Sequence, residues 1–408
     1  MIPRPIPPGR AAPTSRNAPA REPGRVHWME LFFDLVFVAL VGQLAHGIHG
    51  DPGLAQFGTF VLLFFPAWWA WVNIVSVVNL LPNLTARQLG LAMLAAMAAA
   101  SLMAAAAPEA LGNRAWAFSL ANAVLRTILL MLWLYRHRDA IGAAPLWRIW
   151  AYNGGTAALW LVAALLPLDI AVVLWAVAII VEVVLVLVSG RLQPDSGIAG
   201  MNVEHAAERL GLFVIIVLGE SVFTVVTQVS ATWNKEAWLT GALGFVIVAL
   251  LGWTFFQYGM GTLSEGLEQL TRRRDFVAVI ETTLFMPFLL VVGLTAIAGA
   301  ISTAIPAPLT RLPLGSGITL GGGLALFYLT NALVSLRYGQ EAAHVLRWSI
   351  PAVGISLLLV LASTVVAAAA ALGMAVALLI GLTAYMELHK RVAEHRQRAS
   401  TEPFTQKY

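Results

Sequence analysis

Long apolar stretches alternate with short polar gaps along most of the chain. A helix needs about 20 predominantly apolar residues to cross a bilayer, whose hydrocarbon core is about 30 Å thick. The pattern therefore predicts an all-α, polytopic membrane protein with about twelve transmembrane helices. We place the spans at 28–49, 54–79, 84–107, 112–135, 146–166, 168–189, 206–230, 237–261, 276–303, 318–337, 348–371 and 373–389.

Two pairs of neighbouring spans are separated by very little polar sequence. Pro167-Leu168-Asp169 divides 146–166 from 168–189, and Gly373 divides 348–371 from 373–389. We expect each pair to form a helical hairpin. A single irregular element is the alternative.

The composition agrees with a membrane protein and excludes some chemistry. The 408 residues are 59% hydrophobic and 11% charged, whereas soluble proteins are about 25% charged. The chain has no cysteine, which excludes disulfides and thiol chemistry. We find no nucleotide-binding loop, zinc signature or nucleophile elbow. We therefore expect the lipid bilayer as partner, and no cofactor, metal site or nucleic acid.

The distribution of basic residues predicts the orientation. If the N-terminus is cytoplasmic, nearly all of the 25 lysines and arginines fall on the cytoplasmic side. The exceptions are Arg114, Lys235 and Arg311 on the opposite side and Arg126 inside the membrane. A missed span would invert every later loop, so this distribution favours an even number of spans and places both termini in the cytoplasm.

Similar motifs recur in the same order in the two parts of the chain. An HxxE motif opens the first and seventh spans, at His27 and His205, and FSLANAV (118–124) resembles FYLTNAL (327–333). This order predicts two six-helix repeats, which are parallel because six is even. The alternative is that His and Glu simply gather at cytoplasmic helix ends. The predicted parts are a disordered basic Pro/Arg-rich tail (1–26), a first half (27–190), a cytoplasmic linker (191–204), a second half (205–390) and a polar cytoplasmic tail (391–408).

Several ionisable residues fall inside the predicted spans. A charge in a bilayer is expensive, so such residues usually face the bundle interior and mark functional paths. Our candidates for ion or substrate binding are Glu30, Asp34, Arg126, Glu182, Glu208, Arg209, Glu220, Ser221 and Glu281. Four further polar residues could support them: His27, His205, Asn122 and Asn331.

Most of these groups fall on the cytoplasmic side of the membrane midplane. There Arg126 can neutralise one carboxylate, Asp34 or Glu182, through a bidentate bond. The other carboxylates would need a proton, a cation, water or another partner, which is how an ion relay would be built. A structural network is the alternative. Glu208 and Arg209 are consecutive, so they do not face each other on a helix and each needs a partner elsewhere.

Two stretches carry a family resemblance. ELFFDLVFVALVGQLA (30–45) and HAAERLGLFVIIVLGESV (205–222) resemble the paired motifs of the bacterial low temperature requirement A (LtrA) family. The resemblance covers about residues 26–392. It implies a multi-pass protein of the plasma (inner) membrane, in a family that is named for a growth phenotype. Members often have an acidic run after the second span, whereas this chain has NLLPNLTARQ there.

The leading functional hypothesis is a secondary transporter or ion-conducting protein, not an enzyme. Glu30, Asp34 and Glu220 would carry protons or small cations, and Arg126 would be their counter-charge. One alternative is an intramembrane enzyme for a lipid-like substrate, with Glu220-Ser221 and the HxxE pairs as its polar groups. Another is a non-catalytic scaffold or sensor whose basic tails bind anionic lipid. Neither the substrate nor the oligomeric state follows from the sequence.

Overall fold

The computed structural model describes residues 28–80, 85–139, 146–192, 202–273 and 275–401. These residues form helices joined by short loops, together with one isolated bridge between Arg311 and Ala367. The prediction of an all-α protein is therefore confirmed for this part of the chain. The predicted tail 1–26, His27, most of the linker 191–204 and the end of the tail 391–408 lie outside the described residues.

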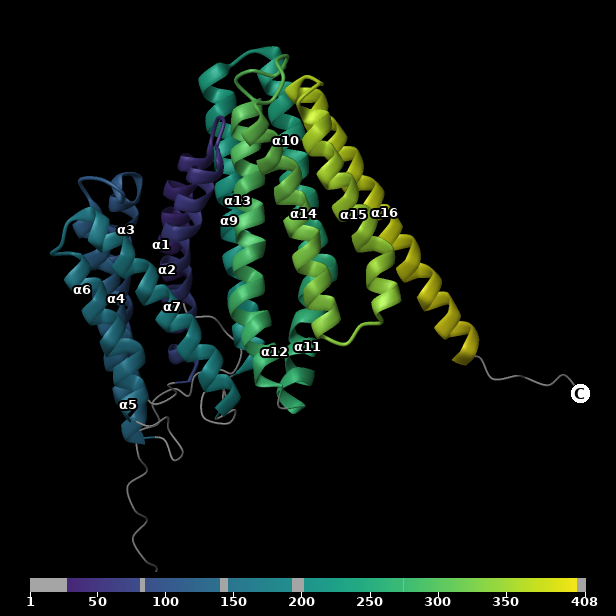
Figure 1. Ribbon diagram of the computed structural model, residues 1–408. Coiled ribbons are helices and arrows are strands. Elements are labelled where there is room, and N and C mark those ends of the chain that lie inside the picture. Colours follow the sequence, from purple (N-terminus) through teal and green to yellow (C-terminus); the bar gives the residue numbers. More distant parts are fainter. Residues whose placement is uncertain (1–27, 81–84, 140–145, 193–201, 274, 402–408) are drawn as a thin grey trace, which may run out of the picture.

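The helices of the first half follow the predicted spans in order (Figure 1). They are α1 (Trp28–Ala45), η1 (His46–Ile48), α2 (Leu54–Asn79), α3 (Ala86–Ala106), η2 (Ala107–Glu109), α4 (Ala115–Asp139), α5 (Leu146–Ile149), η3 (Trp150–Gly155), α6 (Thr156–Ala163) and α7 (Leu168–Leu192).

The helices of the second half are longer on average, and π-helical turns interrupt two of its helical runs. They are α9 (Val203–Thr232), α10 (Lys235–Thr254), the π-turn η4 (Phe255–Gly259), α11 (Met260–Arg272), α12 (Phe276–Ile280), the π-turn η5 (Glu281–Phe285), α13 (Met286–Ala304), α14 (Leu314–Arg337), α15 (Ala342–Ser363) and α16 (Ala368–Thr401).

Polar residues fix where several helices begin. The side chains of Thr85, Asn202, Asn234 and Asp275 each accept a hydrogen bond from a backbone N–H in the first turn of α3, α9, α10 and α12. Such caps satisfy donors that the helix itself leaves unpaired. The cap at Asn202 matters for the site, because it fixes the turn of α9 that leads to Arg209.

Eleven helices in the described part of the chain are long and apolar enough to cross a membrane, one fewer than we predicted. The difference is the span predicted at 146–166. These residues do form a continuous helical run that packs between α4 and α7, but it consists of elements of 4, 6 and 8 residues. Arg148, Tyr152 and Asn153 reduce its apolar content. Both expected hairpins, α6 with α7 and α15 with α16, are confirmed.

Helix α11 is a short helix where the sequence analysis expected only a loop. Leu263, Leu267 and Leu270 share one face and are buried, whereas the intervening Glu268 is exposed. The spacing of these leucines is that of an amphipathic helix, which packs its apolar side on the bundle and keeps its charges outside. This segment has no apolar stretch of membrane length, so the hydrophobic pattern alone did not predict α11.

The outer faces of the peripheral helices are apolar. On α7 the exposed side chains recur every three or four residues and are Ile170, Val173, Val177, Ile180, Val184 and Val188. A continuous apolar face of this length is not kept in water by a soluble monomer. Together with the candidate spans, it shows a multi-pass membrane protein whose outer helices contact lipid.

The centre of the molecule is formed by α1, α9 and α13, with α4 and α6 towards one side and α15 and α16 towards the other (Figure 1). Helices α1 and α9 run in the same direction: Glu30 contacts Arg209 near the start of both, and Gly42 faces Glu220 further along. Helix α3 packs on α1 and α4, and α13 packs in the same way on α9 and α14. The two-repeat organisation itself stays a prediction.

Helices α13 and α14 pack so closely that a glycine is required between them. A methyl group at Gly323 would lie 2.8 Å from both the carbonyl oxygen of Gly293 and Cγ1 of Ile297. At the neighbouring Gly322 the nearest atom is Cγ2 of Ile318, at 3.8 Å. Small residues allow such close approach between membrane helices, where dispersion contacts replace the hydrophobic effect as the driving force.

We therefore expect Gly323→Ala to destabilise the protein and Gly322→Ala to leave it nearly unchanged. Overpacking should lower the free energy of unfolding by about 1–3 kcal/mol at position 323 and by less than about 0.5 kcal/mol at position 322. Thermal unfolding of the detergent-solubilised protein measures both. Equal midpoints for the two variants would contradict the close packing of α13 on α14.

Candidate functional site

A buried arginine–aspartate pair joins the two halves of the chain. Nε of Arg209 on α9 lies 3.0 Å from Oδ2 of Asp34 on α1, and Nη2 lies 2.5 Å from Oδ1. Both side chains are excluded from solvent, at 1% and 0% exposure. This bidentate geometry is the strongest form of a charge-assisted hydrogen bond between a guanidinium and a carboxylate.

A second carboxylate belongs to the same cluster. Oε2 of Glu30 lies 3.3 Å from Nη1 of Arg209 and 3.2 Å from Nε2 of His205. Glu30 and Asp34 are four residues apart on α1, as are His205 and Arg209 on α9, so each pair shares one helix face. Below we call Glu30, Asp34, His205 and Arg209 the inter-half network.

Aromatic side chains separate this network from the rest of the membrane interior. Nε1 of Trp71 on α2 donates a hydrogen bond of 2.7 Å to Oδ1 of Asp34. The Trp71 ring packs on Phe213 with 4.4 Å between ring centroids, and Phe213 also meets Trp68. All three rings are buried. Both oxygens of Asp34 thus have donors, in surroundings that would make an unpaired charge very costly.

The structure corrects the predicted counter-charge. The arginine that pairs with Asp34 and Glu30 is Arg209 and not Arg126. Arg209 faces α1 and finds its partners there, as expected for one of the two consecutive residues on α9. Within the part of the chain that the structure describes, Glu208 takes no part in the inter-half network.

Arg126 has its own partner in the first half. Its Nε lies 2.5 Å from Oε1 of Glu182, and its Nη2 lies 3.0 Å from Oε2. This confirms one of the two predicted alternatives, a bidentate bond between α4 and α7. Both side chains are 1% exposed. The guanidinium also reaches the carbonyl oxygen of Pro66, at 3.4 Å from Nη2, inside the proline-containing helix α2.

Two further carboxylates in the second half also have partners. Glu281, on the π-turn η5, forms an ion pair with Arg337 at the end of α14. Glu387 on α16 accepts a hydrogen bond of 3.0 Å from the hydroxyl of Tyr258 on η4. The carboxylates left over by Arg126 were expected to need a proton, a cation, water or another partner. For Asp34 and Glu30 the partner is Arg209, and for Glu281 it is Arg337.

Glu220 differs from these carboxylates. It is partly buried on α9, and in the described part of the chain it makes no ion pair. Its carboxylate lies against the backbone of α1, where a methyl group at Gly42 would be 2.6 Å from Oε1. His46 is close enough for an electrostatic interaction with Glu220, while Nδ1 of His46 lies 2.7 Å from the carbonyl oxygen of Gly42 and donates to it.

His49 lies beside this carboxylate site, just after the first span, which ends at Ile48. Its ring centroid is 5.0 Å from that of His46, and its Nδ1 is 3.3 Å from Oγ of Ser302 on α13. Burial, and to a smaller extent the nearby His46, lowers the pKa of His49 from 6.5 to about 4. His49 is therefore neutral at neutral pH and provides no fixed positive charge for Glu220.

The remaining candidate residues play smaller parts. Oγ of Ser221 donates to the carbonyl oxygen of Val217, one turn earlier, at 3.0 Å. Asn122 and Asn331 each donate to the carbonyl oxygen of the phenylalanine four residues before, at 3.1 and 2.8 Å. The two asparagines thus have the same local role in the similar motifs FSLANAV and FYLTNAL. His27 lies outside the described residues.

Trp71, Gly42 and Arg337 were not among the predicted site residues. A usable signal existed for Gly42, which follows Glu30 by the same number of residues as Glu220 follows Glu208. If two parallel helices start at the same level, residues at equal distances from the two HxxE motifs face each other. For Trp71 and Arg337 the sequence offers no comparable signal. Their partners, Asp34 and Glu281, lie on other helices, and no shared motif relates the positions on the two helices.

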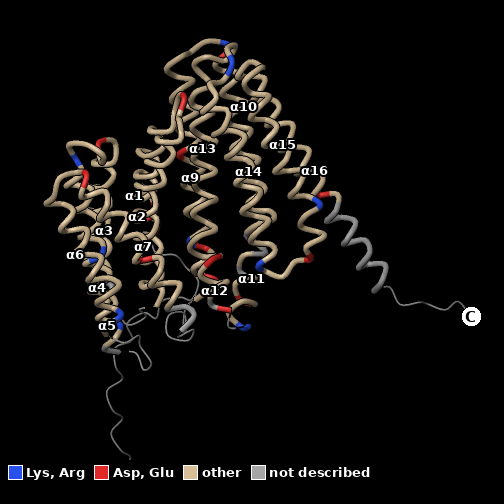
Figure 2. Tube along the Cα trace, in the orientation of Figure 1, with Lys and Arg blue, Asp and Glu red and all other residues tan. Residues whose placement is uncertain are grey.

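Figure 2 shows that most charged residues lie near the two ends of the bundle and few lie between them. The fold and these buried pairs define a polytopic helical membrane protein with a charged network between its halves. A sequence model described as "Bacterial low temperature requirement A protein (LtrA)" matches residues 25–384. The chain belongs to this family, as the resemblance implied. It is also similar to an uncharacterised protein of Rhizobium meliloti (strain 1021), with 29% identity over 290 residues, 68% of this chain and 69% of the relative.

The charge balance of the inter-half network predicts unequal effects of its substitutions. Arg209→Gln leaves two buried carboxylates without their cation and should destabilise the protein by about 3–5 kcal/mol. Asp34→Asn should cost much less, because Arg209 keeps Glu30 and the new amide oxygen can still accept from Trp71. Yield of monodisperse protein and the thermal unfolding midpoint in detergent measure the difference.

Arg272→Gln is the matched control for this experiment. Arg272 pairs with Glu268 on the exposed side of α11, where the side chains are 74% and 59% exposed. Such a pair contributes less than about 1 kcal/mol, so this variant should unfold like the wild type. An Asp34→Asn variant as unstable as Arg209→Gln would contradict this charge balance.

Proposed function

We propose that this protein is a secondary transporter or ion-conducting protein in which Glu220 binds and releases a proton or a small cation. In this proposal the inter-half network closes the other end of the path, where α1 and α9 begin. The proposal gives the protein a place in the plasma (inner) membrane with both termini cytoplasmic. It also treats the two halves as parallel repeats whose first helices, α1 and α9, form the centre.

One observation carries the proposal: Glu220, well inside the membrane-spanning part of α9, lacks the ionic or hydrogen-bonding partner that five other described carboxylates have. Glu30 and Asp34 contact Arg209, Glu182 contacts Arg126, Glu281 contacts Arg337 and Glu387 contacts Tyr258. Placing a carboxylate in the membrane costs free energy, and an ionic or hydrogen-bonding partner offsets that cost. A carboxylate that is not paired with a fixed cation can bind and release a proton or a cation at a lower cost in free energy.

The surroundings of Glu220 fit an exchangeable site. Gly42 leaves room for the carboxylate against the backbone of α1, because it has no side chain of its own. His46 lies close by, just after the end of α1, and is exposed.

Asp34 is a poorer choice for the carrier than the sequence analysis supposed. Three donors on Arg209 and Trp71 occupy its two oxygens, and its side chain is 0% exposed. Releasing this carboxylate would break a bidentate ion pair in an apolar environment. The network is therefore suited to holding α1 against α9. If this contact opens, its ion pairs open together.

The enzyme alternative gains no support from the geometry. A nucleophilic serine needs a base within hydrogen-bonding reach. The hydroxyl of Ser221 donates to the backbone of its own helix, and in the described part of the chain no histidine or carboxylate hydrogen-bonds to it. The scaffold alternative rests on the terminal tails, which lie outside the described side chains.

Glu220→Gln tests the proposal directly. We expect wild-type protein in proteoliposomes to conduct ions or exchange protons under at least one imposed gradient of protons, sodium or potassium. Glu220→Gln should abolish this flux, since the amide cannot ionise, while Asp34→Asn should retain it. Glu236→Gln, an exposed residue at the start of α10, is the control for loss of a carboxylate near the same end of the bundle.

Two results would reject this assignment. Full flux through Glu220→Gln would mean that Glu220 is not the carrier. Flux that is lost in Asp34→Asn but kept in Glu220→Gln would return that role to the inter-half network.

The contact with Gly42 provides an independent test that leaves every charge in place. Gly42→Ala puts a methyl group where the carboxylate of Glu220 lies and should reduce the flux by displacing it. At Gly219, one residue before Glu220, an added methyl meets none of the described atoms within 4 Å, so Gly219→Ala should conduct normally. Equal fluxes for the two variants would mean that the position of Glu220 against α1 does not matter.

A further inference from the structure

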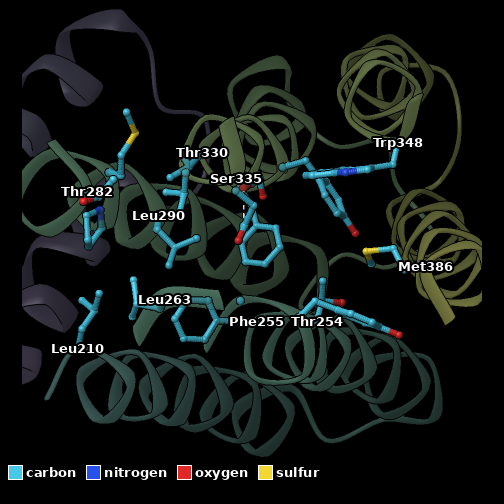
Figure 3. Close-up of a pocket in the computed structure, with 18 residues that line it drawn as sticks. Leu210, Thr254, Phe255, Leu263, Thr282, Leu290, Thr330, Ser335, Trp348 and Met386 are labelled. Carbon is cyan, nitrogen blue, oxygen red and sulfur yellow. Dashed lines mark hydrogen bonds between the residues drawn. The ribbon is translucent and has the colours of Figure 1, made fainter. Parts of the chain in front are cut away.

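A cavity of about 90 Å³ lies inside the second half, and neither Glu220 nor the inter-half network lines it. It is lined by the two π-turns η4 and η5 and by side chains from α9, α10, α11, α13, α14, α15 and α16. Figure 3 shows Thr330 and Ser335 of α14 on one side of it and Thr254 and Phe255 on the other. Trp348 and Met386 lie at one end.

Three hydroxyl groups that line this cavity have no hydrogen-bond partner among the described residues. They belong to Thr254, Tyr328 and Thr330, which are 6%, 1% and 2% exposed. Buried hydroxyls nearly always have partners, so three without one at the same cavity call for an explanation. Each hydroxyl can both donate and accept, which fits a ligand whose own polar groups do the same.

The rest of the lining determines which class of ligand fits. None of the described residues that line the cavity is charged, and Phe255, Phe327 and Trp348 provide aromatic surface. An ion would lack a counter-charge there and would be strongly disfavoured. An uncharged molecule with an apolar part and at least two hydrogen-bonding groups matches both the aromatic walls and the unpartnered hydroxyls.

The backbone around the cavity is irregular on two sides. The π-turns η4 and η5 interrupt the α-helical pattern at residues 255–259 and 281–285, and Pro287 follows the second of them. π-Turns inside α-helices are rare and often occur at functional sites. Both of these turns adjoin the same cavity. Regular, close-packed helices would leave no such space.

The exposure of the lining side chains increases from one end of the cavity to the other. Thr254 and Thr330 are buried, whereas Ser335, Trp348 and Met386 are partly exposed. These last residues lie near the end of α14, the start of α15 and the last described side chains of α16. A small solute can therefore enter from this end and reach the hydroxyls inside.

We propose that this cavity is a binding site for a small uncharged molecule that carries at least two hydroxyl-like groups and an apolar portion. A cavity of about 150 Å³ accommodates benzene, so this one suits a molecule of about four or five non-hydrogen atoms, such as a short-chain diol. The proposal concerns a site that Glu220 does not line, and it holds whether or not the protein moves ions.

The absence of cysteine from the chain allows a direct test. Thr330→Cys and Ser335→Cys each introduce one thiol into the cavity, and their labelling by methyl methanethiosulfonate is followed in the full-length protein in detergent. We expect each thiol to react at least about tenfold faster than that of Ser356→Cys, because accessibility limits thiol reaction. Ser356 is 0% exposed and lies outside the cavity.

The ligand is then tested by protection. The probe 1,2-propanediol should slow the labelling about twofold at its dissociation constant, since half of the sites are then occupied. Sucrose at equal osmolality is too large for the cavity and should not slow the labelling. Thr310→Cys, in an exposed loop, controls for any effect of the diol on the reaction itself.

Each outcome decides the proposal. Fast labelling that the diol slows and sucrose does not would support a diol-binding site. Fast labelling that the diol leaves unchanged would show a cavity filled by water only and would overturn the proposal. Labelling no faster than that of Ser356→Cys at both positions would show that solutes do not enter, and this too would overturn it. Two cavity positions are used so that one variant that fails to fold does not end the test.

Discussion

The cost of placing charge in an apolar bilayer governs the interior of this protein. A carboxylate or guanidinium in the hydrocarbon region loses its hydration, and a partner usually offsets this cost. Arg209 provides that partner for Asp34 and Glu30 at once, and it does so from the other half of the chain. The packing of α1 against α9 therefore depends on the charged side chains that lie between the two helices.

The same constraint explains how the two halves are built internally. In the first half Arg126 joins α4 to Glu182 on α7, and in the second half Arg337 joins α14 to Glu281 on η5. Helix packing around these pairs is apolar and relies on small residues, as at Gly293 and Gly323. Ionic contacts thus specify which helices meet, and close packing determines how near they come.

Against this background the unsatisfied groups are informative. Within the described part of the chain, Glu220 has room beside Gly42 and no fixed cation, and three hydroxyls around the second-half cavity have no partner. Both sites differ from the paired charges described above, and they do so in different ways. Glu220 suits the exchange of a proton or a cation, whereas none of the described residues that line the cavity is charged, so it suits a neutral molecule.

The sequence by itself determined which segments enter the membrane, because about 20 consecutive apolar residues are a local property that no partner alters. It also identified the ionisable residues within those segments and limited Arg126 to two partners. The helical run predicted at 146–166 is present but is not among the eleven candidate spans, because polar residues interrupt it, and α11 was not predicted because it is amphipathic and not apolar throughout. Only the tertiary structure decided that Asp34 meets Arg209, that Gly42 meets Glu220 and that two π-turns border one cavity. These contacts join residues far apart in the chain, and they depend on which faces of which helices pack together. The local sequence does not determine which helix faces pack together, because any of several oppositely charged residues can neutralise a given buried charge.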